Sequence, residues 1–428
     1  MRQKIAIIVQ RYGNEINGGA ELHAKLLAER LNKLYDVTVL TSCANDYVTW
    51  KDYYPVGEQV VDNIKVWRFH SEQKKEKLSR RLFSIMEKMT RRPSLRNYLS
   101  LFNQRMKYWK YAKNRDLLFN HWIRYQGPYC VDLIDYLKAH KQNYAVFVFF
   151  TYLYYPTYAG LKEVSEKSIL IPTAHDEKQF YIPYFESVFS TPAFIMYNTL
   201  SEKKLVERTY PKSQKIPSHI AGVGFDQPQI DANYSPSLQL KDCRYIIYIG
   251  RVVEDKGCHD LIDFFASYKE ASGENVKLVM VGKNQLIKMR EADDVIFTGF
   301  VEEQEKLHLL QNSEALIIPS KYESFSMVTL EAMTMGKPVI AEYQCEVLRN
   351  HIEQSQAGFL YKDQKSFISC LSKTLQLSEE EKQRIRSNGQ MYVQNNYQWD
   401  TIIDKFKDAI THVAGECEDI NGMSYSIF

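Results

Sequence analysis

The order of apolar segments in the first 42 residues constrains the fold most strongly. Lys4–Val9 is typical of a strand, and a polar loop over Gln10–Gly19 separates it from a helical pattern at Ala20–Lys33. A second strand is expected directly afterwards, at Val37–Ser42. A strand, a helix and a strand in so few residues form a βαβ unit, and its two strands are parallel because the helix carries the chain back along the sheet. The pattern therefore predicts an α/β protein.

The same alternation occurs in two series along the chain. In the first series, further strands are expected at Ile64–Phe69, Ala145–Phe150, Ser168–Ile171 and Ala193–Tyr197, with helices at Tyr129–His140 and Pro156–Glu166. The second series has strands at Tyr245–Ile249, Lys277–Val281, Val295–Thr298, Ala315–Pro319 and Pro338–Ala341, and helices at Gly257–Tyr268, Glu303–Gln311 and Ser326–Met335, before a helical tail. Since 428 residues exceed one ordinary domain, two doubly wound α/β halves are predicted.

Composition changes set the predicted domain boundaries. Pro228, Asn233 and Pro236 fall in a loop-like stretch between the two series, which indicates a linker. The expected organisation is an N-terminal domain over residues 1–223 with a basic helical insert at 72–125, a linker at 224–243, and a C-terminal domain at 244–405. A tail over 406–428 is expected to pack back on the N-terminal domain.

Cysteine usage and hydropathy indicate a cytoplasmic protein. The seven cysteines are scattered without a C-x-x-C pair, a pattern that favours reduced thiols over disulfides or a zinc site. The first apolar run is shorter than the apolar region of a signal peptide, and no stretch approaches the roughly 20 apolar residues of a membrane span.

Charge is concentrated in residues 72–125, which hold 15 Lys and Arg against 4 Asp and Glu, a formal +11 in a chain of net charge +3. Leu78, Leu82, Ile85, Met86 and Met89 recur among these charges at helical spacing. One interpretation is a set of solvated helices. The other is a surface that docks on anionic membrane lipid, which would place the protein peripherally on the inner face of a membrane. A nucleic-acid partner is not expected, because no recognised binding motif accompanies the charge.

Two basic residues follow the first strand of the second series. Arg251 comes directly after Tyr248-Ile249-Gly250, and Lys256 lies five residues further on. Ligands of open α/β sheets bind beyond the carboxyl ends of strands. A guanidinium fork and an ammonium at such an edge could hold a diphosphate, although solvated loop charges would show the same pattern.

A second group of residues joins the strand at Ala315–Pro319 to the helix after it. Ser324 or Ser326 is expected to cap that helix, whose first N–H groups favour an anion. Glu323 precedes the helix and Glu331 lies inside it, so the two carboxylates could contact two parts of a long ligand. For either glutamate alone, a capping or surface role is the simpler interpretation.

Glycines and one histidine mark further strand ends. Gly282 and Gly299 end predicted strands, where the backbone can approach a base or simply turn. In the first series, Asn17-Gly18-Gly19 opens a helix and could admit a phosphate or an acceptor. Pro172-Thr173-Ala174-His175-Asp176-Glu177 follows a strand, and we expect a functional His175 that Asp176 orients.

Taken together, the motifs G-R…K-G and P-S…E-S-F-S-M-V-x-L-E-A-M…G-K-P-V-I resemble glycosyltransferase family 4, whose members carry an E-x7-E signature. The resemblance covers roughly residues 245–405. It implies a GT-B fold, in which two Rossmann-like domains face a central cleft. It also implies donor-binding or catalytic roles for these residues: Gly18, Gly19, His175, Arg251, Lys256, Gly282, Glu323, Phe325, Ser326, Met327, Val328 and Glu331. Ser326 departs from the family, because many members have glycine there.

The resemblance implies a retaining transfer of a hexosyl-type sugar from a nucleotide-sugar to a glycan, glycolipid or glycoprotein acceptor, including lipid-linked ones, in surface polysaccharide or glycoconjugate synthesis. No cofactor and no metal are expected, since the chain lacks an Asp-x-Asp motif. Two alternatives remain: a GT-B sugar-nucleotide epimerase and a non-catalytic partner subunit. Release of free nucleotide only with an acceptor would exclude the epimerase, and binding of no nucleotide-sugar would favour the partner.

Overall fold

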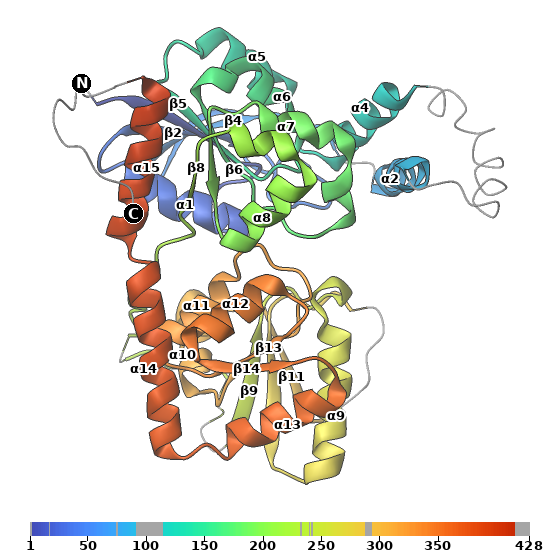
Figure 1. The fold of residues 1–428 in the computed structure, drawn as a ribbon, viewed down its shortest axis with the longest axis vertical. Coiled ribbons are helices and arrows are strands. Elements are labelled where there is room, and N and C mark those ends of the chain that lie inside the picture. Colours follow the sequence, from blue (N-terminus) through green and yellow to red (C-terminus); the bar gives the residue numbers. More distant parts are fainter. Residues whose placement is uncertain are drawn as a thin grey trace. The chain divides into compact units, whose positions relative to one another are not determined.

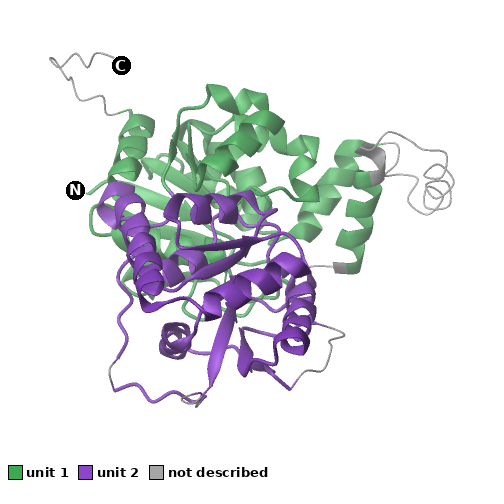
Figure 2. Ribbon diagram, turned by 60° about the horizontal axis from the view of Figure 1, so that its bottom comes forward, with its two compact units in different colours: residues 1–221, 403–428 green, residues 222–402 purple. Residues whose placement is uncertain are grey.

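The computed structural model describes residues 2–16, 18–73, 76–90, 114–231, 233–238, 240, 243–286 and 293–415. The chain divides into two compact units (Figure 2). Unit 1 consists of Met1–Ala221 and Ile403–Phe428, and unit 2 consists of Gly222–Ile402. The chain therefore passes from one unit to the other twice.

Unit 1 is built on a sheet of eight strands in the order β3-β4-β2-β1-β5-β6-β7-β8 (Figure 1). All neighbouring strands are parallel except the β3–β4 hairpin. The strands are β1 (Lys4–Ile8), β2 (Asp36–Ser42), β3 (Gly57–Val61), β4 (Ile64–Phe69), β5 (Val146–Phe150), β6 (Ser168–Ile171), β7 (Phe194–Tyr197) and β8 (Ser218–Ile220). The chain moves outward from β1 in one direction and from β5 in the other, so the topological switch point lies between these two strands.

Helices cover both faces of this sheet, because its central strands are buried on both sides. The helices are α1 (Gly19–Leu31), α2 (Glu76–Thr90), α4 (Arg115–Gln126), α5 (Val131–His140), α6 (Tyr155–Val164), α7 (Glu186–Ser190) and α8 (Leu200–Thr209). Residues of α2, α4, α5 and α6 pack on the face that carries Ala6, Ile8 and Leu40. α1 lies on the other face, where His23 meets the ring of Phe150 edge to face.

Unit 2 has a fully parallel sheet of six strands in the order β11-β10-β9-β12-β13-β14. The strands are β9 (Arg244–Ile249), β10 (Val276–Val281), β11 (Val295–Gly299), β12 (Leu316–Ile318), β13 (Val339–Glu342) and β14 (Gly358–Tyr361). The helices are α9 (Cys258–Ser272), α10 (Glu303–Asn312), α11 (Met327–Thr334), α12 (Glu346–Ser355), α13 (Gln364–Leu375) and α14 (Glu379–Asn396). α9 and α13 pack on the face of Ile246, Tyr248 and Ile317, and α11 and α12 gather on the other face (Figure 1). The switch point lies between β9 and β12.

The sequence predicts the central strands of both units to within about one residue, because these are continuous apolar runs. Residues of the stretch predicted as a linker pack on unit 2: Glu305 of α10 accepts hydrogen bonds from Tyr234, Ser237 and Leu238. The last helix of the described residues, α15 (Trp399–Ala414), begins in unit 2 and contributes to unit 1 through Lys405 Nζ, which donates to the carbonyl of Ile220 at 2.7 Å.

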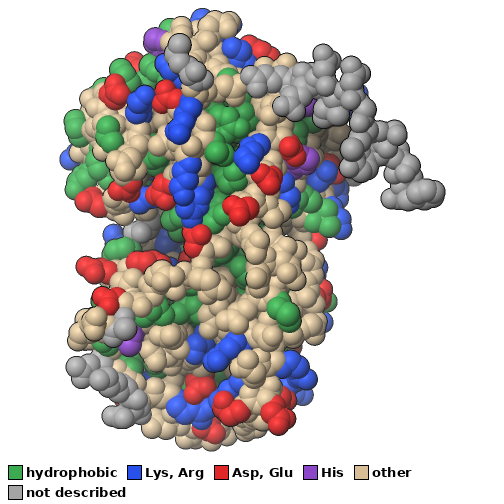
Figure 3. Space-filling view, turned by 90° about the vertical axis from the view of Figure 1, so that its left-hand side faces the viewer, with side chains coloured by type: hydrophobic (Ala, Val, Ile, Leu, Met, Phe, Trp, Pro, Cys, Tyr) green, Lys and Arg blue, Asp and Glu red, His purple; other side chains and the backbone are tan. Residues whose placement is uncertain are grey.

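The basic segment 72–125 is described in part. Residues 74, 75 and 91–113, and with them nine of its fifteen basic residues, lie outside the described residues. In α2, Leu82, Ile85 and Met86 are buried in the core of unit 1, whereas Lys77, Arg80 and Arg81 are exposed. Figure 3 shows a face of the molecule on the side away from α2, where Lys and Arg side chains lie among Asp and Glu side chains. No helix of the described part of the chain is both long and apolar enough to cross a membrane.

Candidate functional site

The predicted donor residues of unit 2 lie at its topological switch point. Arg251 follows β9, and Glu323 follows β12; the two strands are neighbours, with Leu316 opposite Ile247. The carboxyl ends of parallel strands meet at the same edge of a sheet, and a crevice opens where the strand order reverses. Two segments far apart in the sequence are thus brought to one place by the topology alone.

An ion pair joins these two segments. Lys256 Nζ lies 2.7 Å from Glu323 Oε1, and both side chains are mostly buried. Arg251 is exposed, and its backbone carbonyl accepts the hydroxyl of Tyr248 at 2.8 Å. An ammonium has three N–H donors, so Lys256 can hold Glu323 and still donate to a phosphate oxygen.

Glycines allow the loops at this edge to touch through their backbones. A Cβ at Gly257, which has φ of +73°, would overlap the carbonyl oxygen of Pro319 at the end of β12. A Cβ at Gly282 would overlap the carbonyl oxygen of Gly250 at the end of β9. Gly282 therefore has a packing reason to be glycine, independent of any ligand.

Glu331 is held by a second lysine that sequence reasoning missed. Lys306 of α10 places Nζ 3.0 Å from Glu331 Oε2 and 2.8 Å from Glu303 Oε1. Burial lowers the pKa of Lys306, but the two carboxylates more than reverse this, so that its pKa is raised above the ordinary value. The ammonium therefore stays charged, and the position of Glu331 is fixed by it.

Ser326 adopts a backbone conformation that suits glycine. Its φ of 61° and ψ of 66° lie in the left-handed region. Ser326 occupies the N-cap position of α11, as expected. The expected capping hydrogen bond is wrong, because the Ser326 side chain makes none to the helix backbone. The left-handed backbone directs Oγ to Thr329 Oγ1, 2.8 Å away. Met327 and Val328, predicted to offer backbone amides, form the first turn of α11 and are half-buried.

The loop before α11 is held from behind by a buried histidine, also missed from the sequence. His351 Nε2 lies 2.9 Å from the carbonyl oxygen of Phe325, and Nδ1 lies 2.9 Å from the hydroxyl of Tyr392. A carbonyl oxygen only accepts, so Nε2 carries the proton and Nδ1 accepts from Tyr392. Burial lowers the pKa of His351 to about 4, which keeps the ring neutral.

In unit 1, the predicted glycine-rich loop begins α1. Gly18 has an extended backbone, and a Cβ there would overlap the carboxylate of Glu21. That carboxylate is buried with Arg11, whose Nη2 lies 2.6 Å from Glu21 Oε1. Gly19 has nothing within 4 Å of an added Cβ, and Asn17 lies outside the described residues.

His175 is paired, but with a different acid from the one expected. Asp176 does not orient it: Asp176 is exposed and accepts the hydroxyl of Tyr181 at 2.7 Å. The side chain of Glu177 turns back instead, with Oε2 3.6 Å from His175 Nε2, while its Oε1 accepts from Tyr152 at 2.7 Å. Among the described residues His175 Nδ1 has no hydrogen-bond partner, although it is buried.

The segment that carries His175 is held by a buried carboxylate and by strained backbone. Glu202 accepts the backbone N–H groups of Ala174 at 2.5 Å and Asn198 at 2.6 Å, and burial raises its pKa to about 8. Thr151 and Thr173, at the ends of β5 and β6, both have positive φ and lie 3.0 Å apart through their hydroxyl oxygens. β-branched residues adopt this conformation at a cost, and such strain clusters at functional sites.

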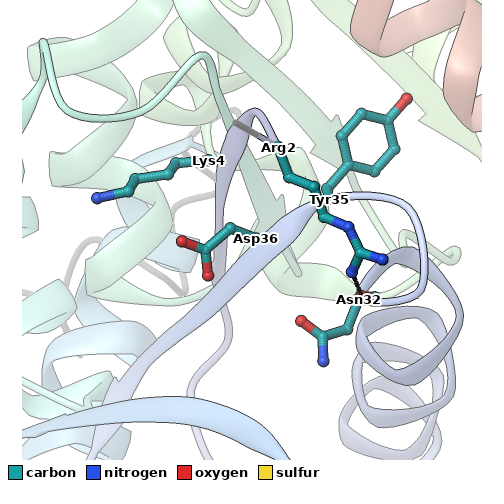
Figure 4. A pocket seen from close by; sticks show the side chains of 5 residues that line it. All are labelled: Arg2, Lys4, Asn32, Tyr35 and Asp36. Atoms are coloured by element: carbon teal, nitrogen blue, oxygen red, sulfur yellow. Dashed lines mark hydrogen bonds between the residues drawn. The ribbon is translucent and has the colours of Figure 1, made fainter.

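One cavity of unit 1 lies at the amino edge of the sheet, whereas ligands of α/β folds bind at the carboxyl edge. A cavity of about 330 Å³ is lined by Arg2, Lys4, Asn32, Tyr35 and Asp36, at the amino ends of β1 and β2. Figure 4 shows Arg2 reaching the carbonyl of Asn32, 3.1 Å away, with Lys4 pointing elsewhere. Among the described residues, no three His, Cys, Asp or Glu side chains gather as metal ligands would.

Comparison with known proteins adds evidence on the second half of the chain. Residues 231–391 match the family described as "Glycosyl transferases group 1". The capsular polysaccharide biosynthesis glycosyltransferase CapM of Staphylococcus aureus is 23% identical over 59% of this chain and 70% of its own length. A glycosyltransferase 1 domain-containing protein of Xenopus tropicalis is 27% identical over 53% of this chain and 69% of its own. These matches support an enzyme of the glycosyltransferase class.

Solved structures resemble nearly the whole length of the chain in fold. A trehalose-6-phosphate synthase, OtsA, superposes with a TM-score of 0.68 at 9% identity, covering 96% of this chain and 99% of that one. HepE of Anabaena, solved with UDP-glucose, superposes with a TM-score of 0.64 at 15% identity over 95% and 99%. The chain has the GT-B fold. At these identities the likeness concerns the fold alone.

The backbone of Ser326 generates a prediction on stability. Ser326→Gly relieves about 1 kcal/mol of left-handed strain and loses about 1 kcal/mol of hydrogen bonding to Thr329, so it should stay within about 1 kcal/mol of the wild type. Ser326→Val should cost about 2 kcal/mol or more, because a β-branched residue is poorly tolerated there. Urea unfolding measures both, and equal tolerance of Val and Gly would contradict the strain.

The neutral His351 predicts a pH dependence. The unfolded chain binds a proton at this ring near pH 6.5, whereas the folded protein does so only near pH 4. Between these values the unfolded state binds more protons, so acidification favours unfolding. This histidine should therefore contribute a loss of about 1–2 kcal/mol of stability between pH 7 and pH 5.

The contribution is isolated by comparing wild type with His351→Gln, whose amide can still donate to the carbonyl of Phe325. Urea unfolding at pH 7 and pH 5 should show a smaller pH effect in the variant. His308→Gln, partly exposed on α10, is the matched control and should behave as wild type. An unchanged pH effect in His351→Gln would contradict a neutral buried ring.

Proposed function

We propose that this chain is a retaining glycosyltransferase of family 4 that moves a sugar from a nucleoside diphosphate donor to a glycan, glycolipid or glycoprotein acceptor. The observation that carries the proposal is the meeting of Lys256 and Glu323, 2.7 Å apart at the switch point between β9 and β12. A cation for a diphosphate and a carboxylate for sugar hydroxyls then stand side by side.

The donor is proposed to bind unit 2 in a defined orientation. Arg251 and Lys256 would hold the diphosphate, and the positive end of α11, at Phe325, Ser326, Met327 and Val328, would face the phosphate and sugar oxygens. Glu323 would contact the transferred sugar and Glu331 the ribose. HepE, similar in fold, was solved with UDP-glucose, which supports a nucleotide-sugar donor here.

Catalysis is proposed to rest on stabilising the leaving group. As the bond between the sugar and the diphosphate breaks, negative charge grows on the phosphate oxygens, where Arg251, Lys256 and the helix dipole favour it. The acceptor hydroxyl would attack from the same face, which retains the anomeric configuration. His175, held near Glu177 and in the segment that Glu202 binds, is proposed to contact the reacting sugar. Gly19, with open space beside it, is proposed to allow backbone contacts, whereas Glu21 fills the space beside Gly18.

The pathway is proposed from the relatives. CapM is named for capsular polysaccharide biosynthesis, and we infer a similar role in surface polysaccharide or glycoconjugate assembly. The thiol content favours a cytoplasmic location.

The donor site predicts a charge-dependent affinity. Calorimetric titration with UDP-, GDP-, ADP- and TDP-sugars should find one preferred nucleotide class. Arg251→Ala/Lys256→Ala should bind it at least about 100-fold more weakly, since each charge-assisted hydrogen bond contributes roughly 1.5–3 kcal/mol.

Arg244→Ala is the matched control: this arginine begins β9, the strand that Arg251 follows, and is paired with Glu314 at 2.9 Å. It should bind the donor as wild type does. If a folded wild-type protein bound none of the four nucleotide classes, the transferase proposal would fail. Once an acceptor is found, NMR of the product tests retention, and inversion of the anomeric carbon would refute that part alone.

We also propose that segment 72–125 docks on an anionic membrane surface. Because Leu82, Ile85 and Met86 of α2 are buried in unit 1, docking would be electrostatic, through exposed side chains such as Lys77, Arg80 and Arg81. Each basic residue near such a surface contributes about 1 kcal/mol, and salt screens the effect.

Vesicle pelleting tests this docking. Vesicles with anionic lipid should retain the protein at low salt, release it at high salt, and lose it when Lys77, Arg80 and Arg81 are replaced by Gln. Equal, weak retention by neutral and anionic vesicles would refute the docking.

A further inference from the structure

Unit 1 buries an arginine without an acidic partner. Arg68, the penultimate residue of β4, is 1% exposed, and among the described residues no carboxylate pairs with it. Its Nε donates to Gln59 Oε1 at 2.9 Å, and the ring of Tyr54 lies over the guanidinium with its centroid 3.9 Å from Cζ. Nη1 is buried with no hydrogen-bond partner. A buried cation in this state is costly unless something anionic compensates it.

Three hydroxyl groups near Arg68 are, like its Nη1, buried without a hydrogen-bond partner in the described structure. They are the hydroxyl groups of Tyr12, Thr41 and Tyr54. Thr41 stands opposite Arg68 in the parallel register of β2 and β4. Tyr12 is close enough to interact with the charge of Arg68, and a Cβ at Gly13 would lie 3.1 Å from the Tyr54 hydroxyl and 3.7 Å from Arg68 Nη2. These unpaired polar groups therefore lie in one part of unit 1.

The hydrogen-bonding capacity of this cluster is unbalanced. Nη1 offers two N–H donors, and each hydroxyl can donate one hydrogen bond and accept others, whereas Gln59 Oε1 already accepts from Nε. A group that only accepts could take up the N–H and O–H donors together. A carboxylate has two oxygens with about four lone-pair sites and matches the planar guanidinium, which makes it the natural complement.

The cluster lies at the carboxyl edge of the sheet, on the β4-β2-β1 side of the switch point between β1 and β5. Arg68 and Thr41 are the penultimate residues of β4 and β2, and Tyr12 stands four residues after β1, in the same loop as Gly18. All three mark carboxyl ends of parallel strands. Towards solvent, Tyr54 is half-buried, and Tyr53, 62% exposed, meets its ring edge to face at 4.9 Å. An exposed tyrosine pair gives a sugar ring an apolar surface with polar tips.

We propose that unit 1 recognises an acidic sugar of the acceptor: the sugar carboxylate binds Arg68 and the hydroxyls of Tyr12 and Tyr54, while the sugar ring rests on Tyr53. Tyr54 moves off the guanidinium to admit the carboxylate. The inference rests on the proposed function and names the substrate class on its acceptor side, a uronic acid or a similarly carboxylated sugar.

Calorimetry on the full chain tests the inference with methyl β-glucuronide, and with methyl β-glucoside as the neutral counterpart, at equal ionic strength. Wild type should bind the glucuronide at least about tenfold more tightly, because a charge-assisted pair with a guanidinium is at stake. Arg68→Met should lose this preference, Arg68→Lys should keep part of it, and Tyr54→Phe should weaken it about threefold or more. Lys65→Met, an exposed charge on the same strand, is the control and should behave as wild type.

The ligand-free Arg68→Met protein should melt no lower than wild type, since it loses an uncompensated buried charge. If it does not fold, Arg68→Lys and Tyr54→Phe decide. Equal affinity for glucuronide and glucoside, or wild-type preference in the Arg68 and Tyr54 variants, would overturn the inference and make Arg68 a structural cation.

Inorganic phosphate is a separate arm: if it bound as tightly as the glucuronide and displaced it, the site would be a general anion site and the sugar class would be wrong. UDP-sugar titrations on the same variants separate the two proposals. If the wild type binds a nucleotide-sugar but does not prefer the glucuronide, only this inference fails. If the folded wild type binds no nucleotide-sugar, the proposed function fails.

Discussion

Contact of backbone on backbone at the carboxyl edge of unit 2 is the constraint on which its site depends. Gly257 lies against the carbonyl of Pro319, and Gly282 lies against the carbonyl of Gly250, each in a space that no side chain could enter. These approaches draw the loops after β9, β10 and β12 together. The ion pair between Lys256 and Glu323 then joins two loops that these backbone contacts already hold close together. Because the glycines hold the loops, the charged groups keep their positions without a ligand.

Arg68 differs from the other charged groups of the candidate sites. In unit 2, Lys256 is paired with Glu323, and Lys306 is paired with Glu331 and Glu303. In unit 1, Arg11 is matched by Glu21, but Arg68 is left with an amide oxygen and an aromatic ring. A buried cation that lacks an anionic partner is costly to the fold, and binding of an anion would remove that cost. The contrast is what separates the Arg68 cluster from the ion pairs that simply stabilise the fold.

The sequence predicts the inner strands well and the outer ones poorly. β1, β5 and β9 are continuous apolar runs because helices cover both of their faces, and their limits follow from composition. β3, β8 and β14 were not predicted; their residues are half-buried or alternate with exposed ones, so their apolar signal is weak. At the candidate site, Lys256 and Glu323 are found from their places at strand ends. Lys306, which pairs with Glu331, and His351, which binds the carbonyl of Phe325, are not predicted from the sequence. A contact between segments far apart in the chain leaves no local sequence pattern. Asp176 and Glu177 show the same limit, since adjacency in sequence favoured the wrong carboxylate.

The bond between His351 and Phe325 fixes the direction of a hydrogen-bond chain. Nε2–H points to the loop carbonyl, so the Tyr392 hydroxyl must point to Nδ1, and Tyr397, 3.3 Å from that hydroxyl, must donate in turn. Gln354 Oε1, 3.5 Å from the Tyr392 hydroxyl, is the second acceptor within reach of that proton. The Nε2 hydrogen of His351 is consequently protected from exchange with water while the loop before α11 stays in place. Its exchange rate therefore reports how often that loop opens.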